Sequence, residues 1–116
     1  MAVTIYHNPR CSKSRQTLAL LEERGIKPQV VEYLKSPPDR ATLTALLRKL
    51  GQPVNALVRR KEPEFSALGL DAPGVTDEQL LDAIATHPKL LERPIVVAGR
   101  KARIGRPPEA VLEILP

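Results

Sequence analysis

The single cysteine of the chain, Cys11, lies among polar and basic residues. His7 precedes it, and Arg10, Lys13 and Arg15 lie on either side of it. A thiolate is a strong nucleophile, and nearby cations favour that charged form of the side chain. The same cations attract anions. The stretch therefore predicts a thiolate that attacks an anion, or a thiol-exchange site. From the local sequence alone, a small buried cysteine explains Cys11 equally well.

The segments on either side of Cys11 predict a strand followed by a helix. A short apolar run at 3–6 indicates a buried strand, and Pro9 ends it. After Cys11, apolar residues recur at helical spacing until Gly25. Cys11 is therefore expected at the N-terminus of a helix. Free backbone N–H groups and the helix dipole favour negative charge there, and so favour the thiolate.

The composition indicates which kinds of binding partner and which cellular compartment suit this protein. The 116 residues suffice for one domain, and the formal charge of +5 is spread along the chain. With two Tyr, one Phe and no Trp there is no platform for stacking bases, so we expect no nucleic-acid partner. One cysteine excludes an internal disulfide and a cysteine-rich zinc site, and is typical of a reducing cytosol. No run of about 18 apolar residues and no signal peptide is recognisable, so we expect a cytoplasmic protein with no membrane contact.

Further strands and helices are predicted along the chain. Asp39 is a favourable N-cap for a helix over 40–50, and Thr76 with Gln79 forms a capping box for a helix that ends near 86. Gly99 favours a two-residue turn between two strands. The remaining predicted elements are strands at 29–33, 95–98 and 101–104, helical fragments at 55–60 and 62–68, and a last helix at 109–114.

The order of these elements predicts an α/β fold. A strand–helix–strand unit at the N-terminus should be parallel, and the C-terminal hairpin is antiparallel. Together they predict a four-stranded mixed sheet flanked by helices. A helical insertion of about residues 36–91 separates the second and third strands, within a single domain over 1–116.

The element order, with a cysteine after the first strand, resembles the thioredoxin-like fold. Four motifs also resemble the glutaredoxin-dependent arsenate reductase (ArsC) family, and the likeness covers about residues 3–115. In this order and spacing the four motifs are specific to that family. They are Tyr6-His7-Asn8-Pro9-Arg10-Cys11-Ser12-Lys13-Ser14-Arg15, Leu57-Val58-Arg59, Arg93-Pro94-Ile95-Val96-Val97 and Arg103-Ile104-Gly105-Arg106-Pro107.

The resemblance implies reduction of arsenate to arsenite, with glutathione as co-substrate, glutaredoxin as partner and no bound metal or flavin. Cys11 falls on the position of the family's nucleophile. Three arginines fall on the positions that hold the oxyanion, and planar guanidinium groups suit a tetrahedral oxyanion better than lysines do. These arginines are Arg59, Arg93 and Arg106.

The resemblance also implies roles for three other residues. His7 falls on a histidine that favours the thiolate form of the nucleophile, and Ser14 falls on a hydroxyl near the sulfur. Pro94 falls on the proline whose preceding peptide bond is cis in thioredoxin-like folds. His87, which precedes a proline, is interpreted as a helix-end residue outside the site.

Two other kinds of cysteine chemistry do not fit the sequence. Phosphatase-like arsenate reductases need an arginine six positions after the cysteine, where this chain has Thr17. A dithiol oxidoreductase needs a second cysteine at the position of Ser14. Without a second thiol in the chain, electrons must come from another molecule.

The motif around Cys11 also departs from the arsenate reductases it resembles. Ser12-Lys13 stand where those enzymes carry Gly-Thr, and Lys13 adds a charge beside the site. One alternative is therefore a glutathione-dependent thiol oxidoreductase, or deglutathionylase, acting through Cys11 on a substrate other than arsenate. Another is a non-enzymatic thioredoxin-like regulator that binds RNA polymerase.

Overall fold

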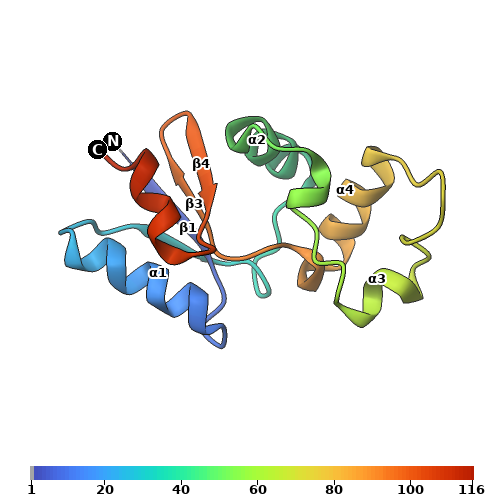
Figure 1. The fold of residues 1–116 in the computed structure, drawn as a ribbon, viewed down its shortest axis with the longest axis horizontal. Coiled ribbons are helices and arrows are strands. Elements are labelled where there is room, and N and C mark those ends of the chain that lie inside the picture. The colour runs from blue at the N-terminus through green and yellow to red at the C-terminus, as the bar shows by residue number, and fades with distance from the viewer. Residues whose placement is uncertain (1) are drawn as a thin grey trace. The chain divides into compact units, whose positions relative to one another are not determined.

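The computed structural model describes residues 2–116, which form two compact units (Figure 1). The first unit joins the N-terminal segment through Ser36 to Arg93–Pro116, and the second is Pro37–Glu92. The second unit covers almost the same residues as the insertion predicted from the sequence. That the whole chain is a single domain stays a prediction.

The first unit is built on a four-stranded mixed sheet with the strand order β2-β1-β3-β4. Strand β1 pairs in parallel with β2, and the helix α1 forms the crossover between them. Strand β3 pairs antiparallel with β1 and with β4. The two pairings predicted from the sequence, the parallel β1–β2 pair and the antiparallel β3–β4 hairpin, are both confirmed. The elements are β1 (Val3–His7), α1 (Ser12–Glu23), β2 (Gln29–Glu32), β3 (Ile95–Ala98) and β4 (Lys101–Ile104).

One face of this sheet is covered by α1 and by the 3₁₀ helix η3 (Pro108–Ile114), which contact each other (Figure 1). Side chains alternate between the two faces of a strand, so every second residue of β1 and β3 points at these helices. The resulting core buries apolar side chains from both strands and both helices. They are Val3, Ile5, Leu21, Val96, Ala98, Val111 and Ile114.

The structure confirms the last helix predicted at 109–114. It is a 3₁₀ helix, and it begins one residue earlier, at Pro108. A 3₁₀ helix has three residues per turn, so side chains three apart lie above one another. Pro108, Val111 and Ile114 have this spacing, and all three are buried. The tighter helix therefore places its three buried residues on one line.

The second unit consists of short helices. The predicted caps are confirmed: the Asp39 carboxylate accepts from Thr42 N at 2.8 Å, and Thr76 and Gln79 form both bonds of a capping box. None of the helices described in residues 2–116 is long and apolar enough to cross a membrane. The helices are α2 (Arg40–Leu50), η1 (Val54–Ala56), α3 (Pro63–Ala67), α4 (Asp77–Thr86) and η2 (Pro88–Leu90).

The helical fragment predicted at 55–60 is wrong beyond Ala56. There the chain becomes extended and forms an antiparallel bridge between Val58 and Leu91. Arg59 N donates to Leu90 O at 2.7 Å, and Glu92 N donates to Leu57 O at 2.8 Å. These bonds use the N–H of Arg59, which a continuing helix would have used internally. Pairing with a distant segment therefore overrides the local helical pattern.

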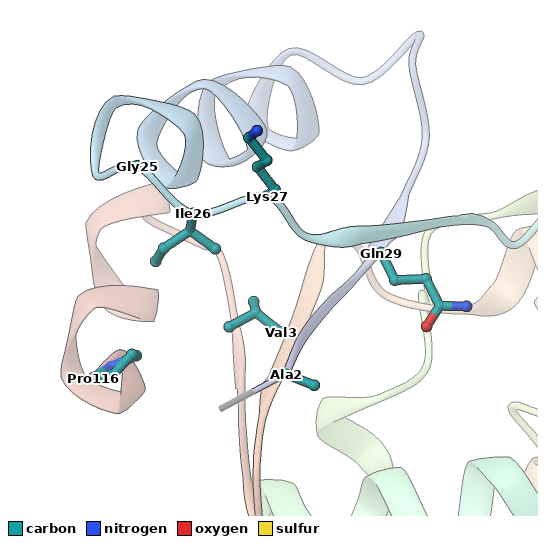
Figure 2. Close-up of a pocket in the computed structure, with 7 residues that line it drawn as sticks. All are labelled: Ala2, Val3, Gly25, Ile26, Lys27, Gln29 and Pro116. Carbon is teal, nitrogen blue, oxygen red and sulfur yellow. The ribbon is translucent and has the colours of Figure 1, made fainter.

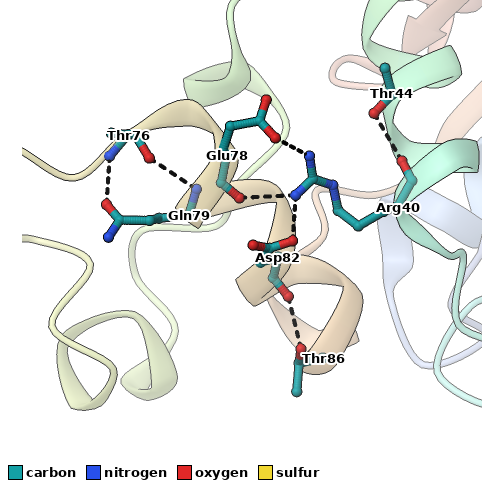
Figure 3. A network of polar contacts seen from close by, with 7 residues as sticks. All are labelled: Arg40, Thr44, Thr76, Glu78, Gln79, Asp82 and Thr86. Carbon is teal, nitrogen blue, oxygen red and sulfur yellow. Dashed lines mark hydrogen bonds and ion pairs between the residues drawn. The ribbon is translucent and has the colours of Figure 1, made fainter.

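Arg40 joins the first turn of α2 to α4 (Figure 3). Its guanidinium donates to the Glu78 backbone carbonyl at 3.1 Å and to the carboxylates of Glu78 and Asp82. The two carboxylates raise the pKa of Arg40 further above its usual value, chiefly through these hydrogen bonds. One side chain thus bridges two helices through both charge and backbone contacts.

We expect Arg40→Ala to lower the melting temperature of the protein more than Arg48→Ala, a matched change at an exposed residue of the same helix. Arg40→Ala leaves two carboxylates of α4 without their cation. The difference between the two variants should shrink as salt is added, because ions screen exposed charges. Thermal melts at low and high salt measure this. Equal melting temperatures at low salt would show that the Arg40 bridge contributes nothing to stability.

Candidate active site

Cys11 is placed by a tight turn that follows β1. Cys11 N donates to Asn8 O at 3.0 Å, which closes a four-residue turn with Pro9 at its second position. Proline favours this position because its φ is already fixed near the required value. The Asn8 side-chain oxygen accepts from Arg10 N at 3.0 Å, as asparagine commonly does in turns. The local sequence thus determines where strand β1 ends and where helix α1 begins.

The turn delivers Cys11 to the N-cap position of α1. Its backbone is extended, with φ −94° and ψ 123°, and its carbonyl accepts from Arg15 N at 3.0 Å. The residue as a whole is 9% exposed and counts as buried. The positive end of the helix dipole lies at this position and attracts anions.

His7 and Ser14 meet beneath α1. His7 is the last residue of β1 and shares the buried face with Val3 and Ile5, because side chains alternate along a strand. Ser14 lies on the buried stripe of α1 together with Thr17. The two polar side chains lie on facing surfaces, and His7 Nδ1 is 2.7 Å from Ser14 Oγ. Ser14 is completely buried and His7 is nearly so.

Ser14 Oγ also accepts a hydrogen bond from Asn8 N at 3.0 Å. The hydroxyl therefore links the strand, the turn and the helix. If His7 Nδ1 carries its proton, Ser14 Oγ accepts two bonds and its own hydrogen is left to donate elsewhere. If Nδ1 is bare, Ser14 donates to it. The tautomer of His7 therefore decides where the Ser14 hydrogen points.

Burial lowers the pKa of His7 below its usual value of 6.5. Glu32 opposes this shift by stabilising the charged ring, whereas Arg15 adds to it by repulsion. His7 is therefore neutral at pH 7. His7 is therefore not one of the cations around Cys11, and any effect of its ring on the sulfur must act through hydrogen bonds.

Arg106 supplies a cation at the sulfur. Its Nη2 lies 3.6 Å from Cys11 Sγ, which is within reach of an N–H···S hydrogen bond. Its Nε donates to the backbone carbonyl of Arg93 at 2.8 Å. Nε thus fixes the planar guanidinium to the backbone, and Nη2 of the same group is left to contact the sulfur.

The other predicted oxyanion-binding arginines are placed as follows. Arg93 begins the second segment of the first unit, its Nε and Nη1 are inaccessible to solvent, and its carbonyl anchors Arg106. Arg59 belongs to the second unit, where its guanidinium lies 2.5 Å from Glu62 and 3.9 Å from Glu92. The first unit thus brings Cys11, His7, Ser14 and Arg106 together, and the structure describes Arg59 only with its own acidic partners.

Pro94 follows a cis peptide bond, as the resemblance implied, and the bond between Arg106 and Pro107 is also cis. The second of these was not expected from the sequence. His87 lies at the C-cap of α4, in agreement with its interpretation as a helix-end residue.

Three contributions to the site were missed by sequence reasoning. They are the Asn8 backbone N–H that binds Ser14, the Arg93 carbonyl that binds Arg106, and the close packing at Gly105. The Asn8-Pro9 turn signal could have indicated the first. The other two depend on contacts between distant segments, and no local pattern marks them.

A cavity of about 410 Å³ lies at the other end of the sheet, beside the start of β1 and the end of α1 (Figure 2). Lys27 is the one titratable side chain among its lining residues, so the side chains there offer no acid–base pair. Within residues 2–116, no three His, Cys, Asp or Glu side chains cluster closely enough to hold a metal ion. The lining residues are Ala2, Val3, Gly25, Ile26, Lys27, Gln29 and Pro116.

The lowered pKa of His7 predicts a pH-dependent stability. In the unfolded chain the ring takes up a proton near pH 6.5, while in the folded protein it does so only at lower pH. The unfolded state therefore binds more protons in this window, and stability is lost as pH falls through it, by up to about 1.4 kcal/mol per pH unit. His7→Gln should remove this loss, whereas His87→Gln should keep it. Urea unfolding at about pH 7.5 and about pH 5.5 measures the difference, and an unchanged loss in His7→Gln would contradict it.

Known proteins resemble this chain along almost its full length. The model of the ArsC family matches residues 6–114. An arsenate reductase of Rhizobium meliloti (strain 1021) is 53% identical over 116 residues, covering 100% of this chain and 83% of the relative. A relative in Escherichia coli (strain K12), the uncharacterized protein YfgD, is 56% identical and covers 97% of this chain and 96% of its own.

Among solved structures, an arsenate reductase from Vibrio cholerae superposes with a TM-score of 0.96 at 54% identity, over 99% of this chain and 98% of that one. The mixed four-stranded sheet flanked by helices is therefore the thioredoxin-like fold expected from the sequence. A family model over nearly the whole chain and relatives more than 50% identical lead to one conclusion: the chain belongs to the ArsC family.

Proposed function

We propose that this protein reduces arsenate to arsenite through a covalent adduct on Cys11, with glutathione and glutaredoxin as electron donors. The observation that carries the proposal is the Arg106 guanidinium 3.6 Å from the Cys11 sulfur, at the N-terminus of α1. A guanidinium and a helix N-terminus both attract a tetrahedral oxyanion to the nucleophile. The similar proteins of Rhizobium meliloti and Vibrio cholerae are named arsenate reductases, which supports the same substrate.

The first step is attack by the Cys11 thiolate on arsenic. An S–As bond forms, and one arsenate oxygen leaves as water. Helix dipole and Arg106 stabilise the negative charge on the sulfur before attack. Arg106, with Arg59 and Arg93 as expected from the family motifs, would neutralise the oxyanion so that one anion can approach another.

The electrons come from two external thiols, because the chain contains one cysteine. Glutathione displaces a second oxygen as water and forms a second S–As bond. A glutaredoxin thiol then attacks the glutathione sulfur, and the two leave joined as a disulfide. The electron pair of the broken S–As bond stays on arsenic, which passes from As(V) to As(III). Water then releases arsenite and restores Cys11.

His7 and Ser14 would act on the sulfur through hydrogen bonding. With Nδ1 protonated, His7 and Asn8 N both donate to Ser14 Oγ. The Ser14 hydrogen is then available to a negatively charged sulfur. In this proposal a neutral histidine favours the thiolate by orienting a hydroxyl, which is consistent with its lowered pKa.

Arsenate-dependent NADPH consumption tests the proposed function. One assay contains glutathione, glutaredoxin and glutathione reductase, and a second contains thioredoxin and thioredoxin reductase. We expect turnover in the first and none with Cys11→Ser, which keeps the size of the side chain but removes the nucleophile. Turnover only in the second assay would replace the electron donor. Reduction of a glutathionylated thiol without arsenate turnover would support the alternative thiol oxidoreductase.

Arg106→Ala should lower kcat/KM for arsenate by roughly 10- to 100-fold, the range expected for losing a hydrogen bond to a charged group. Arg100→Ala is the matched control, since Arg100 is an exposed arginine in the β3–β4 turn of the same unit. Arg106→Lys keeps the charge but not the planar fork, and should recover only part of the activity. Equal activity of Arg106→Ala and Arg100→Ala would exclude a role of Arg106 at the oxyanion. Melting temperatures show whether any loss comes from unfolding.

A further inference from the structure

Gly105 has no room for a side chain. A Cβ atom built on it would lie 2.6 Å from Thr17 Oγ1, 2.8 Å from Pro94 Cγ and 3.2 Å from Thr17 Cγ2. Real Cβ atoms essentially never approach another heavy atom within 3.0 Å. The backbone of Gly105 does not have a positive φ, unlike Gly25 and four others. Glycine is therefore needed here for space and not for backbone conformation.

Both neighbours of Gly105 are fixed in place. Thr17 is completely buried in α1, and its hydroxyl donates to Lys13 O at 2.8 Å. Pro94 is buried and accepts at its carbonyl from Gly105 N, at 2.9 Å. Close-packed interiors relax only partly around an added group. An added methyl group would therefore push the Gly105 segment outward.

The next residue along the chain is Arg106, which contacts the sulfur. Two neighbouring bonds join its segment to the start of β3: Gly105 N to Pro94 O, and Arg106 Nε to Arg93 O. On the other side, Gly105 rests on α1, the helix whose N-cap is Cys11. The depth at which Gly105 packs on α1 therefore sets how far Arg106 lies from Cys11.

We propose that Gly105 is a positioning residue that lets Arg106 approach the Cys11 sulfur, by packing without a side chain against Thr17 and Pro94. An effect of Gly105 on arsenate turnover rests on the proposed function, whereas its effect on the position of Arg106 does not. A shift of about an ångström in the segment would take Arg106 Nη2 beyond hydrogen-bond range of the sulfur, since the two atoms are already 3.6 Å apart.

The test uses two alkylating reagents on the full chain, in which Cys11 is the single thiol. Iodoacetate is anionic and iodoacetamide is neutral, and both react with the thiolate at the same carbon. The thiolate fraction cancels in the ratio of the two rates, so the ratio reports the positive charge beside the sulfur. A unit charge at about 4 Å in water contributes about 1 kcal/mol, which is a factor of roughly five in this ratio.

We expect Gly105→Ala to lower the ratio about threefold to fivefold, to the level of Arg106→Ala. The double variant Gly105→Ala/Thr17→Ala, measured against Thr17→Ala alone, removes both contacts with Thr17 but keeps the one with Pro94 Cγ, and should restore part of the ratio. Gly25→Ala is the stability control. Its Cβ would meet nothing within 4 Å, yet its φ of +73° makes alanine unfavourable, so it should lower the melting temperature and keep the native ratio.

A native ratio in Gly105→Ala would show that Gly105 has a structural role only. A ratio that stays low in the double variant would show that crowding against Thr17 is not the cause. If Gly105→Ala does not fold, Thr17→Ile adds a carbon to the same contact from the helix side and should lower the ratio as well. Absence of arsenate turnover in the native protein would overturn the proposed function, but the reagent ratio would still test Gly105.

Discussion

The site depends on the position of β1 between two other strands. Hydrogen bonds to β2 on one side and β3 on the other fix the register of this strand. A slip by one residue would move every side chain of β1 to the opposite face of the sheet. His7 would then leave Ser14, and the turn that delivers Cys11 would start one residue out of place. The pairing of β1 therefore fixes both the packing of the core and the position of Cys11.

The cation at the sulfur and the buried hydrogen bond between His7 and Ser14 come from different groups. His7 is buried and its pKa is lowered, so it contributes no cation near neutral pH. Arg106 is exposed and keeps a guanidinium at the sulfur. This division has a physical reason, because a buried histidine pays a large desolvation cost when charged and an arginine does not lose its proton. The buried hydrogen bond between His7 and Ser14 is suited to orienting the Ser14 hydroxyl. The exposed guanidinium of Arg106 is suited to binding an anion.

Local sequence patterns predicted the strands, the caps of α2 and α4 and the place of Cys11 at the start of α1, because each depends on neighbouring residues. Three features were beyond such patterns. The extended segment at Arg59 depends on pairing with 90–92, the charge of His7 depends on burial, and the approach of Arg106 depends on space beside Gly105. The family motifs identified Arg106, but not how it is held. Features that depend on contacts between distant segments could therefore not be predicted from the sequence.

The separation of Cys11 and Arg106 along the chain has a consequence for synthesis. The two residues are 95 positions apart, and the whole second unit lies between them. At about 5–20 residues per second, the ribosome makes Cys11 roughly 5 to 20 seconds before Arg106. Closing so long a loop also costs entropy before the contact forms. A nascent chain therefore carries its thiol without the arginine, and the complete pair arises only when β4 joins the sheet.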